Sequence, residues 1–278
     1  MRIKNSRSRS TAGAVALMSL LGLGSLGGCD AAATDESAAQ AAALNEPGGE
    51  ADEAAAFRGD EAARQRRIAK LKSQIRAISL ANQTRTDNLP AVAAQLRPLV
   101  NRLVAIAPTQ TAAERFDLLI GPWYNLWSNL GYGGFTPDLK RIFQVVTRNG
   151  HYYNLSQSPT PIPLIGNAVS ALRGAYAPIP EGFAIRFTRN GFFGGTLVGR
   201  TGADLVKLAA DIESGARPII PLPGPIGITG RLTTIYVDQD LRIVGGDQTP
   251  VFDDNGKVTV PGQYDLLFVL DRQVGPVQ

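Results

Sequence analysis

The first regular pattern of apolar positions in this chain is helical. Between residues 61 and 80, Ile68, Leu71, Ile75 and Ile78 follow at spacings of three and four, which places them on one face of a predicted helix. Basic side chains fill many of the other positions: Arg64, Arg66, Arg67, Lys70, Lys72 and Arg76. Such a helix either packs on the protein, with its charges in water or against acidic residues, or lies on anionic lipid headgroups. We favour packing.

A second predicted helix follows a short polar segment. Asp87 and Asn88 are natural helix caps, and Pro90 suits the first helical turn. Apolar residues then recur as far as Ile106, and Pro98 is expected to kink the helix or limit its regularity. Residues 64–114 are therefore predicted to be a helical lead-in.

From residue 115 onward, the apolar positions alternate with the period of β-strands. The predicted strands are residues 123–130, 141–147, 151–155, 183–188, 192–198, 232–237, 241–244 and 265–270. Two Asn-Gly pairs, Asn149-Gly150 and Asn190-Gly191, are expected to form hairpin turns. Alternation also predicts that Trp123 and Trp127 share one strand face. With one further helix at 203–213, residues 115–278 are predicted to be an antiparallel barrel or closed sandwich.

The N-terminus has the residue order of a secretory signal. A basic stretch precedes residues 12–26, which are apolar or small but too short and glycine-rich to span a bilayer comfortably. The segment ends in Leu26-Gly27-Gly28-Cys29, which resembles the lipobox of bacterial lipoproteins, and Cys29 is the only cysteine of the chain. We therefore expect residues 1–28 to be a lipoprotein signal peptide. Cys29 is expected to carry the lipid anchor, including palmitate-type acyl chains.

Residues 29–63 are predicted to be a flexible acidic tether. They are rich in alanine, glutamate and glycine, contain one base, Arg58, and hold too little apolar bulk to offset the entropy of ordering. The four basic residues of the signal account for the whole formal charge of +4, so nucleic acid is not an expected partner. Asp30 slightly favours retention of the lipoprotein at the inner membrane, facing the periplasm. Anchoring at the outer membrane is the alternative.

The residues give little support to catalysis. His151 is the only histidine, no Gly-x-Ser-x-Gly element is present, and the single thiol is assigned to the anchor. Asp238 and Asp240 flank a predicted turn, where aspartate bonds its own backbone. We predict no metal site, no cofactor and no catalytic residue, and therefore a protein that is not an enzyme. An enzyme of unrecognised type is the last alternative.

Several segments of the chain resemble segments of one protein family and occur in the same order along the sequence. Phe116 to Trp123 lead into the first strand, and residues 143–154 form the next hairpin. The most specific segment is residues 235–243, Ile-Tyr-Val-Asp-Gln-Asp-Leu-Arg-Ile, followed by residues 267–270. Over residues 64–273, these segments resemble the PAP/fibrillin (plastid lipid-associated protein) family, in a bacterial lipoprotein form. Gly245 replaces the second arginine of that family, and residues 248–265 are an insertion before the last strand.

This resemblance implies a mainly β protein with N-terminal helices and a lipocalin-like antiparallel barrel that binds or organises lipids. Trp123 would then close one barrel end, with Arg242 stacked on its ring. Aromatic residues on the predicted strands are candidates for the wall of an apolar ligand pocket. They are Tyr124, Phe143, Tyr153, Phe183, Phe187 and Tyr236.

The sequence thus predicts an exported protein, anchored to a membrane through Cys29, that binds a lipid or another small hydrophobic ligand. The first alternative is a structural lipoprotein with a filled barrel that organises membrane or partner proteins. The sequence does not identify protein partners.

Overall fold

A computed structural model describes residues 61–130, 138–159, 166–222, 224–252, 258–260 and 262–278. Cys29, the signal peptide, most of the predicted tether and part of the 248–265 insertion lie outside the described residues. No helix in the described part of the chain is both long and apolar enough to cross a membrane.

The described helices are α3 (Glu61–Ala81), α4 (Leu89–Ile106), α5 (Ala112–Leu119) and α6 (Gly202–Ser214). Three of the helices agree with the apolar stripes of the sequence, whereas α5 was not predicted as a separate helix. Thr111 caps α5 by accepting a hydrogen bond from the backbone N–H of Glu114, whose carboxylate accepts one from the N–H of Thr111. Thr201 and Asp204 repeat this arrangement at α6. These local signals fix where the helices begin, whereas their positions depend on the sheet.

In the described part of the chain, eight long strands and three short ones follow the first helices. The barrel strands are β1 (Gly121–Ser128), β2 (Ile142–Val146), β3 (His151–Pro159), β4 (Asn167–Ile179), β5 (Gly182–Gly194), β7 (Thr229–Val237), β8 (Leu241–Gln248) and β11 (Gln263–Arg272). The short strands are β6 (Ile220–Pro221), β9 (Val251–Phe252) and β10 (Val258–Val260). The last two pair with each other within the predicted insertion.

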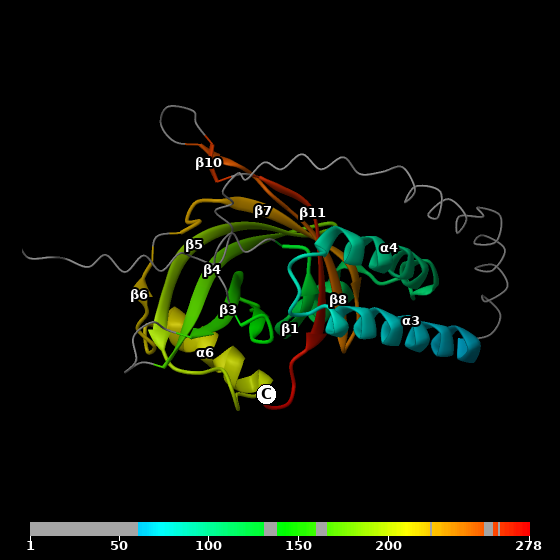
Figure 1. Cartoon of the computed structure of the whole chain (residues 1–278), viewed down its shortest axis with the longest axis horizontal. Coiled ribbons are helices and arrows are strands. Elements are labelled where there is room, and N and C mark those ends of the chain that lie inside the picture. Colours follow the sequence, from blue (N-terminus) through cyan, green and yellow to red (C-terminus); the bar gives the residue numbers. More distant parts are fainter. Residues whose placement is uncertain (1–60, 131–137, 160–165, 223, 253–257, 261) are drawn as a thin grey trace, which may run out of the picture.

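The strands close into an antiparallel barrel (Figure 1). The order β4-β3-β2-β1-β11-β8-β7-β5 is completed by pairing of β4 with β5, so the eight strands form a ring. The predicted lipocalin-like barrel with N-terminal helices is therefore confirmed. A closed ring leaves no exposed edge among these strands, since every barrel strand pairs on both sides.

Both faces of the barrel wall are buried over much of their area. Helices α3 and α4 pack on the outside of β1, β11, β8 and β7, and α6 packs on the outside of β2 and β3 (Figure 1). A separate apolar cluster fills much of the interior and includes Trp123, Tyr152, Phe183 and Phe268. In β2, every residue is buried, so burial alone does not distinguish an inward from an outward side chain.

The second predicted hairpin was wrong. Asn190 and Gly191 lie inside the continuous strand β5, and the turn before it is formed by Pro180 and Glu181. A Cβ at Gly191 would lie 2.7 Å from the carbonyl oxygen of Ile220, so this glycine permits the close approach of β6 rather than a turn. Strand β4, which pairs along nearly all of β5, was not predicted.

The prediction that Trp123 and Trp127 share a face was also wrong. The register of β1 against β11 shifts between Asn125 and Trp127, which marks a β-bulge. An extra residue reverses the alternation of side chains beyond it. Trp123 therefore joins the interior cluster, whereas Trp127 and its neighbour Leu126 pack beneath α3 and α4.

Packing of α3 on the barrel can be measured with two substitutions on the same helix. Ile75 is fully buried against the barrel, whereas Leu80 is 52% exposed. Ile75→Ala should lower the free energy of unfolding by about 2–5 kcal/mol, and Leu80→Ala should change it by less than about 0.5 kcal/mol. Urea unfolding curves provide the comparison. Equal effects of the two substitutions would mean that α3 is not docked as described.

Candidate ligand-binding site in the barrel interior

One end of the barrel is closed by Trp123 and Arg272. The indole Nε1 of Trp123 donates to the carbonyl oxygen of Leu119 at 2.8 Å, and the guanidinium carbon of Arg272 lies 3.7 Å from the indole ring centroid. Arg272 Nη1 donates to the carbonyl oxygen of Ile120 at 2.6 Å, and Nη2 donates to that of Leu118. The arginine thus combines a cation–π contact with hydrogen bonds to two backbone carbonyls at the C-terminal end of α5.

Arg242, the predicted partner of Trp123, has a different position. Its guanidinium carbon lies 5.9 Å from the ring centroid, farther than that of Arg272. Arg242 thus lies within cation–π range of Trp123 as predicted, but Arg272, which was not predicted, is the closer partner of the ring. Sequence reasoning missed Arg272 because it comes from the end of β11, and only the pairing of β11 with β1 places it opposite Trp123.

Arg242 is an isolated cation inside the barrel. Its side chain is fully buried, and Nη1 donates to Gln144 Oε1 at 3.2 Å. Among the described residues, neither Nε nor Nη2 has a hydrogen-bond partner, and no described carboxylate forms an ion pair with this guanidinium. Burial lowers the pKa of Arg242 to about 10, with a smaller contribution from the positive charge of Arg272. The group is still charged at neutral pH, where an uncompensated buried cation is destabilising.

A narrow cavity of about 70 Å³ lies inside the barrel, and Gln144, the hydrogen-bond partner of Arg242, is one of its lining residues. Its polar lining residues include Asn125, Gln144, Asn154 and Gln248. Among the described residues, Asn125 Oδ1 and Gln248 Nε2 find no hydrogen-bond partner although both residues are buried. The apolar part of the lining consists mainly of Leu130, Ile142, Ile185, Phe187, Leu232, Leu266 and Phe268. Polar groups without partners beside an apolar wall are the ordinary composition of a small-ligand site.

The predicted pocket residues fall into two groups. Phe187 lines the cavity, and Phe183 lies in the interior cluster. Phe143 and Tyr153 instead pack in the layer under α6, Tyr236 packs under α3 and α4, and Tyr124 contacts both of these outer layers. The four outward aromatic residues are therefore corrected to the outside of the barrel. The helices bury that face as well, so apolar character did not reveal which face points inward.

Polar residues inside otherwise apolar strands were the missed signal for the cavity. Gln144 interrupts the run Ile142 to Val146, and Asn125 interrupts the aromatic run of β1. A polar side chain within a buried strand needs a partner, so these two positions could have been selected as candidate ligand contacts from the sequence.

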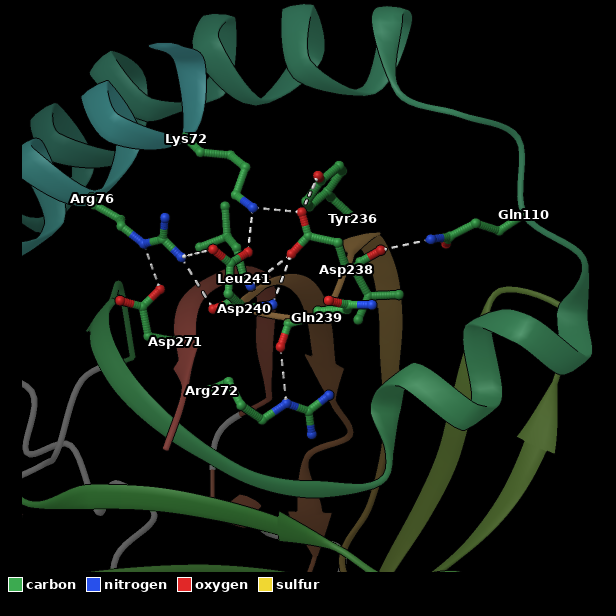
Figure 2. A network of polar contacts seen from close by, with 11 residues as sticks. Lys72, Arg76, Gln110, Tyr236, Asp238, Gln239, Asp240, Leu241, Asp271 and Arg272 are labelled. Carbon is green, nitrogen blue, oxygen red and sulfur yellow. Dashed lines mark hydrogen bonds and ion pairs between the residues drawn. The ribbon is translucent and has the colours of Figure 1, made fainter. Parts of the chain in front are cut away.

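A network of charged residues holds α3 to the barrel (Figure 2). Asp238 Oδ1 accepts from the backbone N–H groups of Asp240 and Leu241, at 3.0 and 2.8 Å, which agrees with the predicted turn role. Its Oδ2 accepts from Lys72 Nζ at 2.6 Å, and Lys72 also bonds Asp240. Arg76 Nε donates to Asp271 Oδ1 at 2.7 Å. Two of the basic residues of α3 are therefore paired with the barrel rather than free for lipid headgroups.

A wider groove of about 560 Å³ lies outside the barrel, between α3, the α4–α5 connection and β7. Its lining includes Lys72, Gln110 and Asp238. Lys72 is paired with Asp238, and Gln110 Nε2 donates to the carbonyl oxygen of Val237 at 2.9 Å (Figure 2). These charged and amide groups already have partners, whereas the hydroxyl of Thr234 in the same lining has none among the described residues.

His151 belongs to a cluster that ties β3 and β4 to α6. Arg173 contacts both carboxylate oxygens of Glu213, at 2.6 and 2.8 Å, and Tyr153 donates to Glu213 at 2.5 Å. His151 Nε2 lies 2.7 Å from Arg173 Nη2, and burial together with this cation lowers the pKa of His151. Within the described part of the chain, no group of three or more His, Cys, Asp or Glu residues is placed to hold a metal ion.

No protein-family model matches this chain, and no curated protein does. Any function proposed for this chain therefore rests on its own residues and their geometry.

Substitution of the two arginines by methionine should have opposite effects on stability. Arg272→Met leaves two backbone carbonyls without their charged donor and removes the ring contact, so the free energy of unfolding should fall by about 1.5–3 kcal/mol. Arg242→Met removes a buried charge without an ionic partner, so stability should be unchanged or higher. Chemical unfolding of ligand-free protein measures both. A large loss of stability in Arg242→Met would make Arg242 a structural residue.

Proposed function

We propose that this protein is an exported, lipid-anchored binding protein whose barrel holds a lipid or another small hydrophobic ligand. The observation that carries this proposal is the interior cavity with its apolar wall and unpartnered amide groups, together with the buried cation Arg242, whose partner Gln144 lines that cavity. An antiparallel barrel of eight strands is just wide enough to hold one small ligand. The fold is compatible with this function, and the chemistry of the interior supports it.

Stability alone does not account for the polar interior. A barrel that served only as a rigid scaffold would be more stable with apolar residues in place of Arg242, Asn125 and Gln248, because each leaves a buried polar atom without a partner among the described residues. Residues that lower the free energy of unfolding and form no compensating contact within the protein are typical of binding sites. This contrast supports a ligand over a filled core.

A structural, membrane-organising lipoprotein is the second candidate. The observation in its favour is the tight interior: Trp123, Tyr152, Phe183 and Phe268 occupy much of the barrel, and the cavity of about 70 Å³ is small beside the several hundred cubic ångströms of ordinary ligand sites. Under this alternative the outer helices and the groove beside α3 would contact partner proteins.

The membrane anchor is the other half of the proposal. It rests on the lipobox-like segment ending at Cys29, and the acidic tether would let the barrel reach the surface of its own bilayer. Membership of the PAP/fibrillin family is also a proposal from sequence alone, and it rests on segments 116–123, 143–154 and 235–243.

Ligand binding can be tested with full-length protein carrying Cys29→Ser, which has no acyl chains of its own. We expect saturable uptake of one long-chain lipid per protein, measured by native mass spectrometry and titration calorimetry. Leu266→Trp, placed in the cavity wall, should weaken uptake about tenfold or more by filling the space. Leu80→Trp, on the exposed part of α3, is the matched control and should bind normally. A protein that takes up no lipid, or equal uptake by both tryptophan variants, would favour the structural alternative.

The anchor is tested separately from the barrel. In bacterial cells that express the full-length chain, Cys29→Ser should prevent acylation and release of the signal peptide at this site, which mass measurement of the purified protein detects. Lipid uptake by the barrel should persist, because Cys29 lies far along the chain from the described domain. Loss of both acylation and uptake in this variant would contradict a modular arrangement.

A further inference from the structure

Arg242 lies 5.9 Å from the Trp123 ring centroid, which is near the limit of a cation–π contact, and most of its guanidinium is unused by the described residues. Arg272 supplies the closer cation, at 3.7 Å from that centroid, and bonds carbonyl oxygens at the C-terminal end of α5. Arg242 makes one hydrogen bond, to Gln144, and its Nε and Nη2 have no partner among the described residues. A fully buried guanidinium with two unused donors indicates an anionic group that comes from outside the chain.

Arg242 is not itself a lining residue of the cavity, but the strand register and its bonded partner place it near the inner end. On β8 it lies opposite Leu270 of β11, which in turn lies opposite the cavity residue Asn125 of β1. Its one bonded partner, Gln144, is itself a cavity residue. Farther along the strands, away from Trp123, the lining includes the apolar Leu232, Leu266 and Phe268. It ends near the buried Gln248 and the exposed Arg231 and Asp247. The cation is therefore at the closed end and the apolar wall leads outward.

The two free donors of Arg242 match one particular chemical group. Nε–H and Nη2–H point the same way along one edge of the planar guanidinium, which is the edge that a carboxylate contacts with both oxygens. The guanidinium remains protonated at neutral pH, so a carboxylate would neutralise it and occupy both donors together. Nη1 stays bonded to Gln144 in this arrangement.

The narrow cavity limits the shape of the ligand. A volume of about 70 Å³ holds a few water molecules, or the first few carbons of a single unbranched chain. A phospholipid with two chains would need a much wider space beside Arg242. The side chains nearest the outer part of the cavity, Phe187, Leu266 and Phe268, offer apolar contact to a methylene chain.

We propose that Arg242 is the head-group site of the barrel and binds the carboxylate of a long-chain fatty acid, whose chain runs outward along Phe187 and Phe268. This inference rests on the proposed binding function and specifies its ligand class and orientation.

The decisive experiment compares palmitic acid with hexadecanol, which has the same chain and no charge. Both are titrated at pH 8 into full-length Cys29→Ser protein and into its Arg242→Met and Arg231→Met derivatives. The parent should bind the acid at least about tenfold more tightly than the alcohol, since bonds to charged groups are lost with the alcohol. Arg242→Met should remove this preference while retaining alcohol binding. Arg231→Met changes the cation at the outer rim and should retain the preference.

A second measurement uses the parent protein alone and so does not depend on the folding of a variant. Palmitic acid labelled with ¹³C at the carboxyl group should, when bound, stay ionised at lower pH than free fatty acid, because the adjacent cation favours the carboxylate. The carboxyl chemical shift in a pH titration reports this directly. Titration of the bound acid at or above its ordinary pKa would overturn the assignment.

Each other outcome has a defined meaning. Equal affinities of the parent for acid and alcohol would leave the binding function standing and overturn the role of Arg242. A preference lost in Arg231→Met but kept in Arg242→Met would place the acid group at the rim and overturn the orientation. Competition by acetate at the concentration at which palmitic acid binds would show a free-anion site without a chain subsite. Absence of binding by both ligands would contradict the proposed function itself.

Discussion

The rest of this structure depends on the pairing of its first and last barrel strands. Strands β1 and β11 are separated by most of the domain in sequence, and their pairing places Trp123 directly opposite Arg272. The stacking of Arg272 on Trp123 and its bonds to the carbonyl oxygens of Leu118 and Ile120 lie at this seam. Closure of the ring and closure of one barrel end are therefore produced by the same contacts. A barrel closed at this end directs any interior ligand toward the other one.

The outer helices contribute to the same closure from outside. Lys72 and Arg76 of α3 reach the β7–β8 turn and the end of β11, through Asp238, Asp240 and Asp271 (Figure 2). These ion pairs are partly exposed, so each adds little stability by itself. Their effect is positional, because they fix the register of α3 over an apolar layer that includes Ile75 and Trp127. The basic face that suggested a membrane surface is in part an attachment to the barrel.

In the barrel interior, several polar residues reduce stability rather than add to it. Most of it is packed with aromatic and aliphatic side chains, yet Arg242, Asn125 and Gln248 leave polar atoms without partners among the described residues. Such groups weaken a core unless a ligand completes them. Asn125 and Gln248 line one narrow cavity, and Arg242 bonds Gln144 of the same lining, which is the basis for proposing a specific polar contact there. The anchor predicted at Cys29 would hold that cavity near a source of amphiphiles.

The sequence by itself determined the class of fold, the helices and the position of most strands, because these follow from local periodicity and capping residues such as Thr201. It also indicated the turn at Asp238 and the first hairpin at Asn149-Gly150. Only the tertiary structure decided which side of each strand faces the interior, since helices bury the outer face as fully as the ring buries the inner one. A single bulge in β1 sent Trp127 outward, and a close strand contact at Gly191 replaced the expected turn. The choice between Arg242 and Arg272 likewise depended on pairing between distant strands, which no local pattern contains.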